Sequence, residues 1–123
     1  MRMWMLSPEF MCLRHLLGEH VECHMLASSI ILHKTLDGYA HNHLIELTSL
    51  QSRHDALALE ITRRGYHHYS PLPSFSLSNY SSFITSSRVD LTQSYQALLS
   101  RCPRCRTNYG TLIYRLELSQ DFL

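Results

Sequence analysis

The chain has 123 residues, of which 45% are hydrophobic and 17% are charged, a composition that allows one hydrophobic core and excludes an intrinsically disordered chain. Eleven Lys and Arg against ten Asp and Glu leave a formal net charge of +1, so composition alone does not indicate a nucleic-acid-binding protein. No apolar run approaches the roughly 20 residues of a membrane span, and we expect no membrane partner.

The amino-terminal residues and the cysteines indicate the compartment. The segment that starts at Met1 lacks a full hydrophobic region before Pro8 and Glu9 interrupt it, so we expect no leader peptide. Without a secretory signal, reduced thiols are favoured over two disulfides. We therefore expect a soluble, cytoplasmic protein. Its four cysteines are Cys12, Cys23, Cys102 and Cys105.

The first half of the chain predicts two helices. Residues 8–32 carry apolar side chains within a narrow arc at helical spacing. Asp37 and Gly38 end this stretch, and residues 39–46 are expected to form a loop or short turn. Residues 49–64 predict a second helix, which ends before Gly65. The predicted core positions of the two helices are Cys12, Leu16, Cys23, Leu26, Ile30, Leu50, Leu57 and Ile61.

The second half predicts one more helix between two less regular segments. Residues 66–87 hold two prolines and eight serines, which is typical of an extended connection. Asp90 and Gln93 have capping-box spacing, so a third helix should start there and end before Pro103. It should bury Leu91, Tyr95 and Leu98. Apolar residues alternate over 111–118, which predicts a strand or an extended segment.

These elements together predict an all-α fold. We expect a single domain over residues 1–123, built from about three packed helices, the serine-rich connection and a short carboxy-terminal extension. At this length, one core is the default. No glycine-rich phosphate loop, HExxH or GxSxG occurs, which argues against nucleotide hydrolases, zinc proteases of that type and α/β-hydrolases.

The densest polar cluster lies on the first predicted helix. His15, Glu19 and Glu22 have i, i+4 and i+7 spacing and therefore lie along one side. Glu19 falls inside the apolar arc, whereas His15 and Glu22 lie at its border, a position that suits a carboxylate working on a substrate. The alternative is that Glu22 is a solvated surface acid and Glu19 a buried polar group with a partner. Helical spacing alone favours this alternative.

Cys102 and Cys105 form a CxxC pair, which could be half of a zinc site or a redox pair. A structural zinc normally needs four ligands, and no second CxxC occurs. Cys12, Cys23 or the histidines would have to complete the site from another helix. A redox pair lacks the βαβ context that usually surrounds it. We therefore expect no metal site and no cofactor.

The pattern His-Leu-x-x-Glu-x-x-Glu over residues 15–22 resembles the first-helix signature of the pyrimidine-dimer DNA glycosylases and abasic-site lyases of the endonuclease V type. Two further stretches are similar to that family: residues 52–66, which end in Arg64-Gly65-Tyr66, and residues 87–101. The resemblance covers about residues 1–101 and leaves 102–123 as a divergent tail.

The resemblance implies a set of site residues. In that family an amino-terminal α-amine attacks the sugar, and a glutamate on the first helix assists it. An ungapped comparison puts Met1 at the nucleophile position and Glu22 at the catalytic glutamate. Arg2, His15 and Arg101 match DNA-contacting positions. Arg2 is bulky and should discourage removal of Met1, so the nucleophile would be the amine of Met1 itself.

The implied activity is DNA repair. A glycosylase with abasic-site lyase activity would act on damaged double-stranded DNA, through an imine at the amino terminus and β-elimination. The resemblance further implies a monomer without a metal or cofactor, in a prokaryotic or phage-infected host cell. An α-amine has a pKa of about 7.7 to 8.0 against about 10.4 for lysine, so an appreciable fraction is nucleophilic near pH 7. Val21 and Met25 stand where the family has DNA-binding arginines.

Two alternatives stay open on the sequence. One is a DNA-binding relative that has lost catalysis, suggested by Val21, Met25 and the low net charge. It would bind DNA without forming an imine. The other is a small zinc-stabilised interaction module built on Cys102 and Cys105, for which stoichiometric metal would be the discriminating observation.

Overall fold

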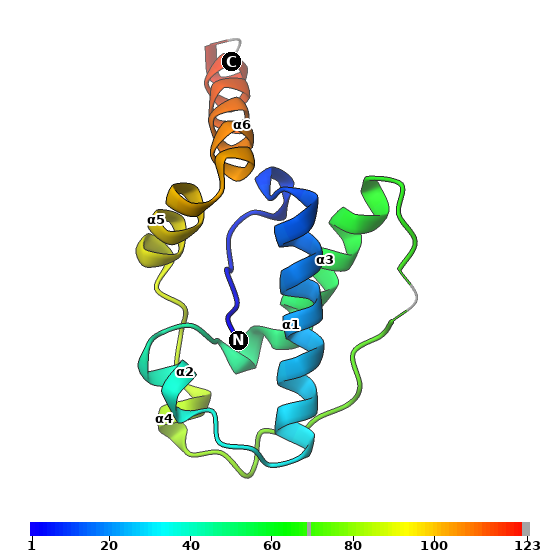
Figure 1. The fold of residues 1–123 in the computed structure, drawn as a ribbon, viewed down its shortest axis with the longest axis vertical. Helices are drawn as coiled ribbons and strands as arrows, with labels where there is room; N and C mark the ends of the chain where they lie inside the picture. The colour runs from blue at the N-terminus through cyan, green and yellow to red at the C-terminus, as the bar shows by residue number, and fades with distance from the viewer. Residues whose placement is uncertain (69, 122–123) are drawn as a thin grey trace.

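The computed structural model describes residues 1–68 and 70–121, and within these ranges the regular structure is entirely helical. The predicted all-α class is therefore confirmed (Figure 1). None of the helices in the described ranges is long and apolar enough to cross a membrane. The elements in chain order are η1 (Pro8–Phe10), α1 (Leu13–Ile31), α2 (Asp37–His41), η2 (Leu47–Ser49), α3 (Leu50–Arg63), α4 (Ser82–Thr85), α5 (Leu91–Arg101) and α6 (Pro103–Asp121).

The centre of the fold is the packing of α1 against α3. Both helices bury the apolar faces that the sequence predicts, and every one of the eight predicted core positions of this pair of helices is buried. Full burial of one such aliphatic side chain stabilises the fold by about 1.5–3 kcal/mol. Because the two faces meet along most of both helices, side chains on the border of these faces are held in fixed positions.

The amino-terminal segment is part of the core and not a loose end. Met3, Trp4 and Leu6 are buried. The segment that carries them runs beside α1 (Figure 1). The Met3 N–H donates to the carbonyl of Leu44 at 2.7 Å, and the Ser94 hydroxyl donates to the carbonyl of Trp4 at 2.6 Å. These bonds fix the first residues of the chain next to the middle of α1.

The helix ends show which stop signals the chain uses. Gly65 has a φ of 92°, and the Tyr66 N–H donates to the Ile61 carbonyl at 3.2 Å, the arrangement that ends a helix at a left-handed glycine. The predicted stop at Gly65 is confirmed. Asp37 and Gly38 do not end the first helix, because α1 already stops at Ile31 and these residues begin α2. His33, with a φ of 54°, supplies the left-handed turn after α1.

The serine-rich connection is mostly irregular, but it contains the short helix α4. The third predicted helix corresponds to α5, and the Gln93 N–H donates to the Asp90 carboxylate at 3.1 Å, as the capping spacing predicts. Leu98 is buried and Tyr95 is half-buried, whereas Leu91 is 51% exposed, so its predicted burial is wrong. Leu91 is the first residue of α5, where one side of the turn faces solvent.

The predicted carboxy-terminal strand is wrong, because residues 103–121 form the long helix α6. Pro103 starts this helix, a position that proline favours because its missing N–H has no partner there. Leu116 and Leu118 are exposed, and residues 1–68 and 70–121 contain no strand with which this segment could pair. A helix satisfies its own backbone hydrogen bonds and needs no partner.

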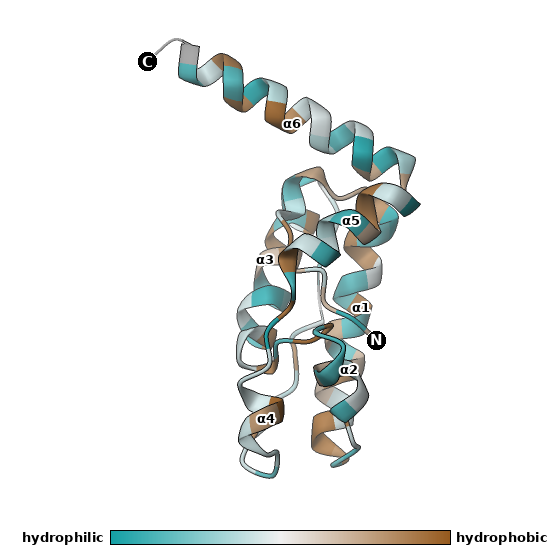
Figure 2. Ribbon diagram, turned by 90° about the vertical axis from the view of Figure 1, so that its left-hand side faces the viewer, coloured by the Kyte–Doolittle hydropathy of each residue, from teal (hydrophilic) through white to brown (hydrophobic). Residues whose placement is uncertain are grey.

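Only the first turns of α6 pack on the body of the protein. Tyr109 contacts Phe10 of η1 and Tyr95 of α5, with ring centroids 5.2 Å and 5.5 Å apart. Beyond this aromatic contact the helix extends away from the other helices (Figure 2). The α5–α6 junction therefore sets the direction of the whole carboxy-terminal helix.

Candidate active site

A cleft of about 320 Å³ lies where the amino-terminal segment crosses α1 near the end of α5. We call it the amino-terminal cleft. Four of the residues that the sequence predicts as site residues line it: Arg2, His15, Glu22 and Arg101. The structure thus brings together side chains from the chain start, α1 and α5. The remaining lining residues are Trp4, Arg14, Gly18 and Glu19.

The amino terminus lies beside Glu22. The backbone N–H of Arg2, one residue after the terminal amine, donates to Oε2 of Glu22 at 3.4 Å. The positive charge of the amino terminus also acts on the Glu22 carboxyl and lowers its pKa. Met1 itself is half-buried and lines a neighbouring hollow of about 550 Å³, together with Val21 and Met25. The predicted nucleophile and the predicted catalytic carboxylate are therefore neighbours in space.

The net effect on Glu22 is a pKa above the ordinary value for glutamate. Burial is the main cause, because it disfavours the charged carboxylate, and the nearby Glu19 raises the pKa further. The Arg2 N–H, the amino terminus and the Arg2 side chain oppose the shift without cancelling it. A half-buried acid with a raised pKa next to a cleft is typical of groups that exchange protons with a substrate.

Arg2 is a cation without an anionic side chain of its own. Its guanidinium stacks over the Trp4 ring, with Cζ 3.8 Å from the ring centroid. Among the described residues, its buried Nε has no hydrogen-bond partner. Burial first, and then the positive charge of Arg101, lowers the pKa of Arg2. Two arginines that repel each other across a cleft, one with an unused donor, form a favourable site for an anion such as a phosphate.

Glu19 has a different role from Glu22. Its carboxylate is fully buried and accepts two bonds from Arg53 of α3, from Nε at 2.6 Å and from Nη2 at 2.8 Å. The Arg53 Nη1 donates in addition to the carbonyl of Leu6 at 2.6 Å. The interpretation of Glu19 as a buried polar group with a partner is confirmed. Glu22, in contrast, is half-buried at the cleft.

His15 and Arg101 lie between the amino-terminal cleft and a group of cysteines. Nδ1 of His15 is 3.2 Å from the Cys12 sulfur, and its ring meets the edge of Trp4 with centroids 6.0 Å apart. Arg101 is the last residue of α5 and precedes Cys102. Both line the cleft and also a hollow of about 350 Å³ over the cysteines.

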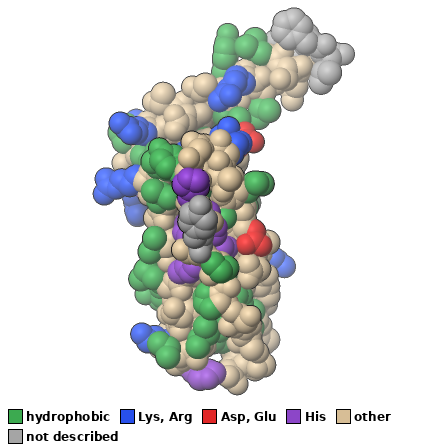
Figure 3. Space-filling model, turned by 90° about the vertical axis from the view of Figure 1, so that its right-hand side faces the viewer, with side chains coloured by type: hydrophobic (Ala, Val, Ile, Leu, Met, Phe, Trp, Pro, Cys, Tyr) green, Lys and Arg blue, Asp and Glu red, His purple; other side chains and the backbone are tan. Residues whose placement is uncertain are grey.

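A second group of titratable side chains lies on the far side of α1. Histidine side chains gather on the face shown in Figure 3, where His20 and His24 of α1 meet His54 of α3 and His68 of the connection. Nε2 of His20 is 2.6 Å from Nε2 of His68. Burial first, then the neighbouring histidines, lowers the pKa of His20 to about 4. Burial is also the main cause of a lowered pKa of His24, so His20 and His24 are neutral near pH 7.

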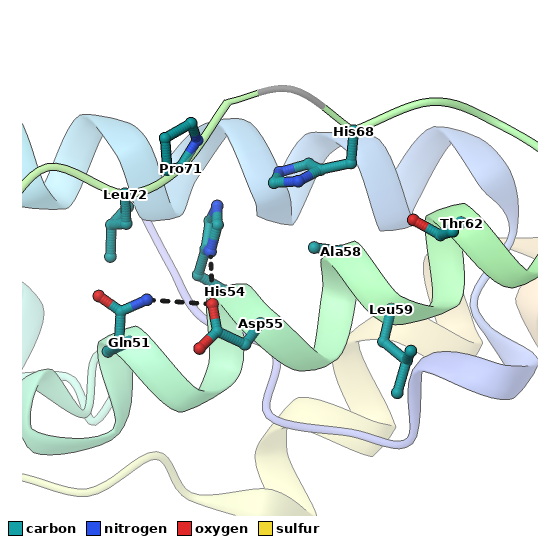
Figure 4. Close-up of a pocket in the computed structure, with 9 residues that line it drawn as sticks. All are labelled: Gln51, His54, Asp55, Ala58, Leu59, Thr62, His68, Pro71 and Leu72. Carbon is teal, nitrogen blue, oxygen red and sulfur yellow. Dashed lines mark hydrogen bonds and ion pairs between the residues drawn. The ribbon is translucent and has the colours of Figure 1, made fainter.

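The histidine cluster borders a hollow of about 520 Å³. His54 engages both ring nitrogens with protein partners, Nδ1 with Asp55 Oδ1 at 3.0 Å and Nε2 with the Ser70 carbonyl at 3.1 Å. Gln51 donates to the same Asp55 oxygen at 3.0 Å (Figure 4). The predicted site residues do not line this hollow, and its polar groups are occupied with each other.

Two groups in the described part of the chain bring ligand atoms close enough together to hold a metal ion. One is the histidine cluster. The other consists of Cys12, His15, Cys102 and Cys105, whose ligand atoms lie within 4.8 Å of one another. On the sequence, Cys12 and the histidines were among the groups that could complete a zinc site with Cys102 and Cys105, but the pattern could not select His15, because the two halves are about 90 residues apart along the chain.

Sequence reasoning missed three residues of the amino-terminal cleft: Trp4, Arg14 and Gly18. Trp4 gave no signal, because a lone aromatic residue near a terminus is usually a core residue, and Trp4 is indeed buried. Arg14 adjoins His15 and could have been found from the same helix. Gly18 leaves open space on the cleft side of α1, since an added Cβ would meet no atom within 4 Å.

The comparison with family models identifies the family of the chain. The model for the family described as pyrimidine dimer DNA glycosylase matches residues 1–74, a range that holds α1, α3 and all of the predicted site residues except Arg101. The chain therefore belongs to the pyrimidine dimer DNA glycosylase family. No curated protein and no solved structure matches it.

Proposed function

We propose that this protein is a pyrimidine dimer DNA glycosylase that also cleaves the strand as an abasic-site lyase, with the α-amine of Met1 as nucleophile. The family supports a glycosylase acting on DNA. The observation that carries the finer proposal is the 3.4 Å hydrogen bond from the Arg2 N–H to Glu22. It holds the terminal amine beside a half-buried carboxylate at the edge of a cationic cleft.

The reaction begins with the unprotonated α-amine. The amine nitrogen bonds to C1′ of the damaged nucleotide, and the glycosidic bond breaks, so that the base leaves with the bonding electrons and takes up a proton. Opening of the sugar ring then gives an imine between the amine and C1′. α-Amines are less basic than lysine amines, so more of the nucleophilic form is present near pH 7.

Strand cleavage follows from the imine. Loss of a proton from C2′ moves electrons toward C3′, and the C3′–O bond to the phosphate breaks. A cation at C1′ and a mobile proton at C2′ both call for a nearby carboxylate, which stabilises the first and accepts the second. Glu22 supplies this group. Hydrolysis of the imine finally releases the amine.

The cations around the cleft hold the DNA backbone. Arg2 has an unused buried donor, Arg14 and Arg101 line the same cleft, and arginine binds phosphate oxygens in a bidentate manner. His15 has one ring nitrogen on the cysteine side, which leaves the other for the cleft. With a net charge of +1, we expect modest affinity that falls steeply with salt.

Borohydride trapping tests the proposal. The untagged protein is incubated with an abasic-site duplex in the presence of borohydride, and a covalent protein–DNA adduct is expected. A variant with two extra residues before Met1 should form no adduct, because its amine lies away from Glu22. Glu22→Gln is tested beside them, because it removes the proposed catalytic carboxylate. Glu117→Gln, which neutralises an exposed acid on α6, is its matched control.

Strand cleavage is measured on the same duplex and on one with a pyrimidine dimer. Cleavage by the wild type and the Glu117→Gln control, with loss in the extended variant, is the expected result. DNA binding without any adduct would contradict the lyase proposal and favour a DNA-binding relative without catalysis.

A further inference from the structure

Cys12, His15, Cys102 and Cys105 form a group that we call the cysteine–histidine corner. The proposed reaction uses neither its three cysteines nor Nδ1 of His15. The Cys12 and Cys102 sulfurs are 3.8 Å apart. Nδ1 of His15 is 3.2 Å from the Cys12 sulfur and 3.9 Å from the Cys105 sulfur. All four ligand atoms lie within 4.8 Å of one another. Three sulfurs and one imidazole nitrogen thus surround a single point.

We propose that the cysteine–histidine corner is a structural zinc site with three cysteine ligands and one histidine ligand. Tetrahedral zinc, with bonds of about 2.3 Å to sulfur and about 2.05 Å to nitrogen, separates two sulfurs by about 3.8 Å and a sulfur from a nitrogen by about 3.6 Å. Three of the separations in the corner are 3.2, 3.8 and 3.9 Å, close to these values, and every pair of ligand atoms is within 4.8 Å. The cluster therefore needs little movement to close on the ion.

The ligands come from two short segments, each with two residues between its ligands. Cys12 and His15 flank the start of α1, and Cys102 and Cys105 flank the start of α6. Backbone N–H groups point at the sulfurs: Cys12 N–H donates to Cys105 Sγ at 3.2 Å, and Cys105 N–H donates to Cys102 Sγ at 3.4 Å. Such bonds, together with the positive ends of two helices, stabilise thiolates.

The surroundings suit the charge of the complex. Three thiolates, a neutral imidazole and Zn²⁺ give a net charge of about −1, and arginines line the adjoining hollow: Arg14, Arg101 and Arg104. The three cysteines are buried, with Cys105 fully so, which excludes competing water from the sulfurs. The 3.8 Å between Cys12 and Cys102 is far longer than a disulfide of about 2.05 Å.

A zinc ion here would tie three parts of the fold together. It would join the start of α1, the end of α5 and the start of α6, which otherwise meet through a few aromatic and thiol contacts. Arg101 directly precedes the ligand Cys102, so the site would also fix a cation of the amino-terminal cleft. The proposal itself is independent of the glycosylase activity, because it rests on the four ligands alone.

Metal content and cobalt spectroscopy test the site on the full chain. Protein purified without chelators should contain one zinc ion per chain, as measured by elemental analysis with inductively coupled plasma mass spectrometry. The metal-free protein titrated with Co²⁺ should show intense visible bands of tetrahedral cobalt and thiolate-to-cobalt charge-transfer bands that saturate at one equivalent. Zinc should then displace the cobalt. Octahedral, weakly absorbing cobalt or no stoichiometric metal would overturn the proposal, whether or not the enzyme is active.

Matched variants assign the ligands. Cys105→Ala and His15→Gln should lose the metal, whereas Cys23→Ala, a change of a buried cysteine outside the corner, should keep it. His20→Gln controls for metal bound in the histidine cluster. Loss of zinc in His20→Gln with retention in His15→Gln would place the metal elsewhere and contradict the proposal. A Cys102–Cys105 disulfide in the protein as isolated, with no metal, would do the same and indicate a redox pair.

Discussion

Two glutamates three residues apart on α1 meet arginines in opposite ways. At the interface of α1 and α3, Glu19 and Arg53 are both buried and share two hydrogen bonds. At the amino-terminal cleft, Glu22 accepts a bond from the backbone of Arg2, while the Arg2 guanidinium stacks on Trp4 and keeps a buried donor without a partner in the described chain.

The two glutamates illustrate two roles of charged groups: one stabilises the fold, and the other is available to a ligand. A buried ion pair whose hydrogen bonds are all made has no free donor or acceptor for a ligand. Removal of one partner lowers the stability of the fold. Half-buried charges that are incompletely paired lower the stability of the free protein. Such charges are typical of sites where a substrate supplies the missing partner. Changes at the interface should therefore alter folding, and changes at the cleft should alter catalysis.

The largest expected effect is on catalysis at the cleft. Glu22→Gln keeps the shape of the side chain and removes its charge and its capacity to accept a proton. We expect strand cleavage at abasic sites to slow by about 10²–10⁴-fold, the range for loss of a positioned acid or base. Single-turnover cleavage measures it, with Glu117→Gln as control. A rate within about threefold of wild type would contradict the assignment.

The raised pKa of Glu22 adds a pH dependence with a definite sign. The reaction needs both the unprotonated α-amine and the Glu22 carboxylate. Protonation of Glu22 should therefore add a second loss of cleavage on acidification, at a pH above the ordinary glutamate pKa of 4.5. Because the folded pKa lies above the unfolded one, ionised Glu22 costs stability at neutral pH. The melting temperature of Glu22→Gln should therefore exceed that of wild type at pH 7 and match it below about pH 4. A lower melting temperature at pH 7 would show that Glu22 is structural.

Removal of a charge at the interface of α1 and α3 should lower stability, in contrast to Glu22→Gln. Arg53→Met leaves the Glu19 carboxylate buried without its cation, and we expect a loss of about 3–5 kcal/mol in the free energy of unfolding. Urea denaturation measures this loss. The double variant Glu19→Leu, Arg53→Met removes both charges and should recover most of the stability. If the double variant is as unstable as Arg53→Met, the unpaired charge is not the cause.

The histidine cluster should make the fold sensitive to acid. The pKa of His20 is about 4 in the folded protein against a usual 6.5, so the unfolded chain binds protons first. Stability should be complete above about pH 6.5 and fall as the pH drops toward 4. The four rings lie close together here, and the facing acid, Asp55, hydrogen-bonds to His54 at 3.0 Å and also acts on His68 through its charge.

Melting temperatures at pH 7 and pH 5 measure this effect. His20→Gln should show a smaller drop between the two values than the wild type does. His41→Gln, a change of an exposed histidine on α2, should behave like the wild type. An equal drop in all three proteins would show that the cluster does not carry the acid sensitivity.

The smallest expected effect is at Gly18, where stability and activity should move in opposite directions. Alanine in a helix interior is favoured over glycine by about 1 kcal/mol, and an added Cβ meets no atom within 4 Å. Gly18→Ala should therefore be slightly more stable. The added Cβ would take up space in the cleft that the DNA occupies in the proposed complex, so the KM for abasic DNA should rise. Gly110→Ala on α6, with equally open surroundings, should raise stability alone.

The central helices were predictable because their pattern is long and periodic. The faces of α1 and α3 follow from the spacing of residues such as Leu16, Cys23 and Leu57. Glu19 was expected to be a buried group with a partner, but the spacing on one helix cannot name Arg53, which comes from another. The same limit applies to the cleft, where Trp4 and Arg14 enter only through the folded path of the chain.

The carboxy-terminal third was predicted least well. Alternating apolar residues from Leu112 to Leu118 fit a strand, but the physics of an isolated segment without a strand partner favours a helix. The CxxC was visible, and Cys12 was one of several groups that could complete its site, but nothing in the sequence favoured Cys12 over Cys23 or His15 over the other histidines. Only the fold brings the two halves within hydrogen-bond distance.

The location of the imine tests the central claim most directly. The chain has two kinds of amine, the α-amine of Met1 and the single lysine, Lys34, and both residues line the same hollow. The borohydride-reduced adduct on abasic DNA is digested and mapped by mass spectrometry, for the wild type and for Lys34→Arg. We expect a DNA-derived mass on Met1 and undiminished trapping in Lys34→Arg. A modification on Lys34, with trapping lost in Lys34→Arg, would contradict it.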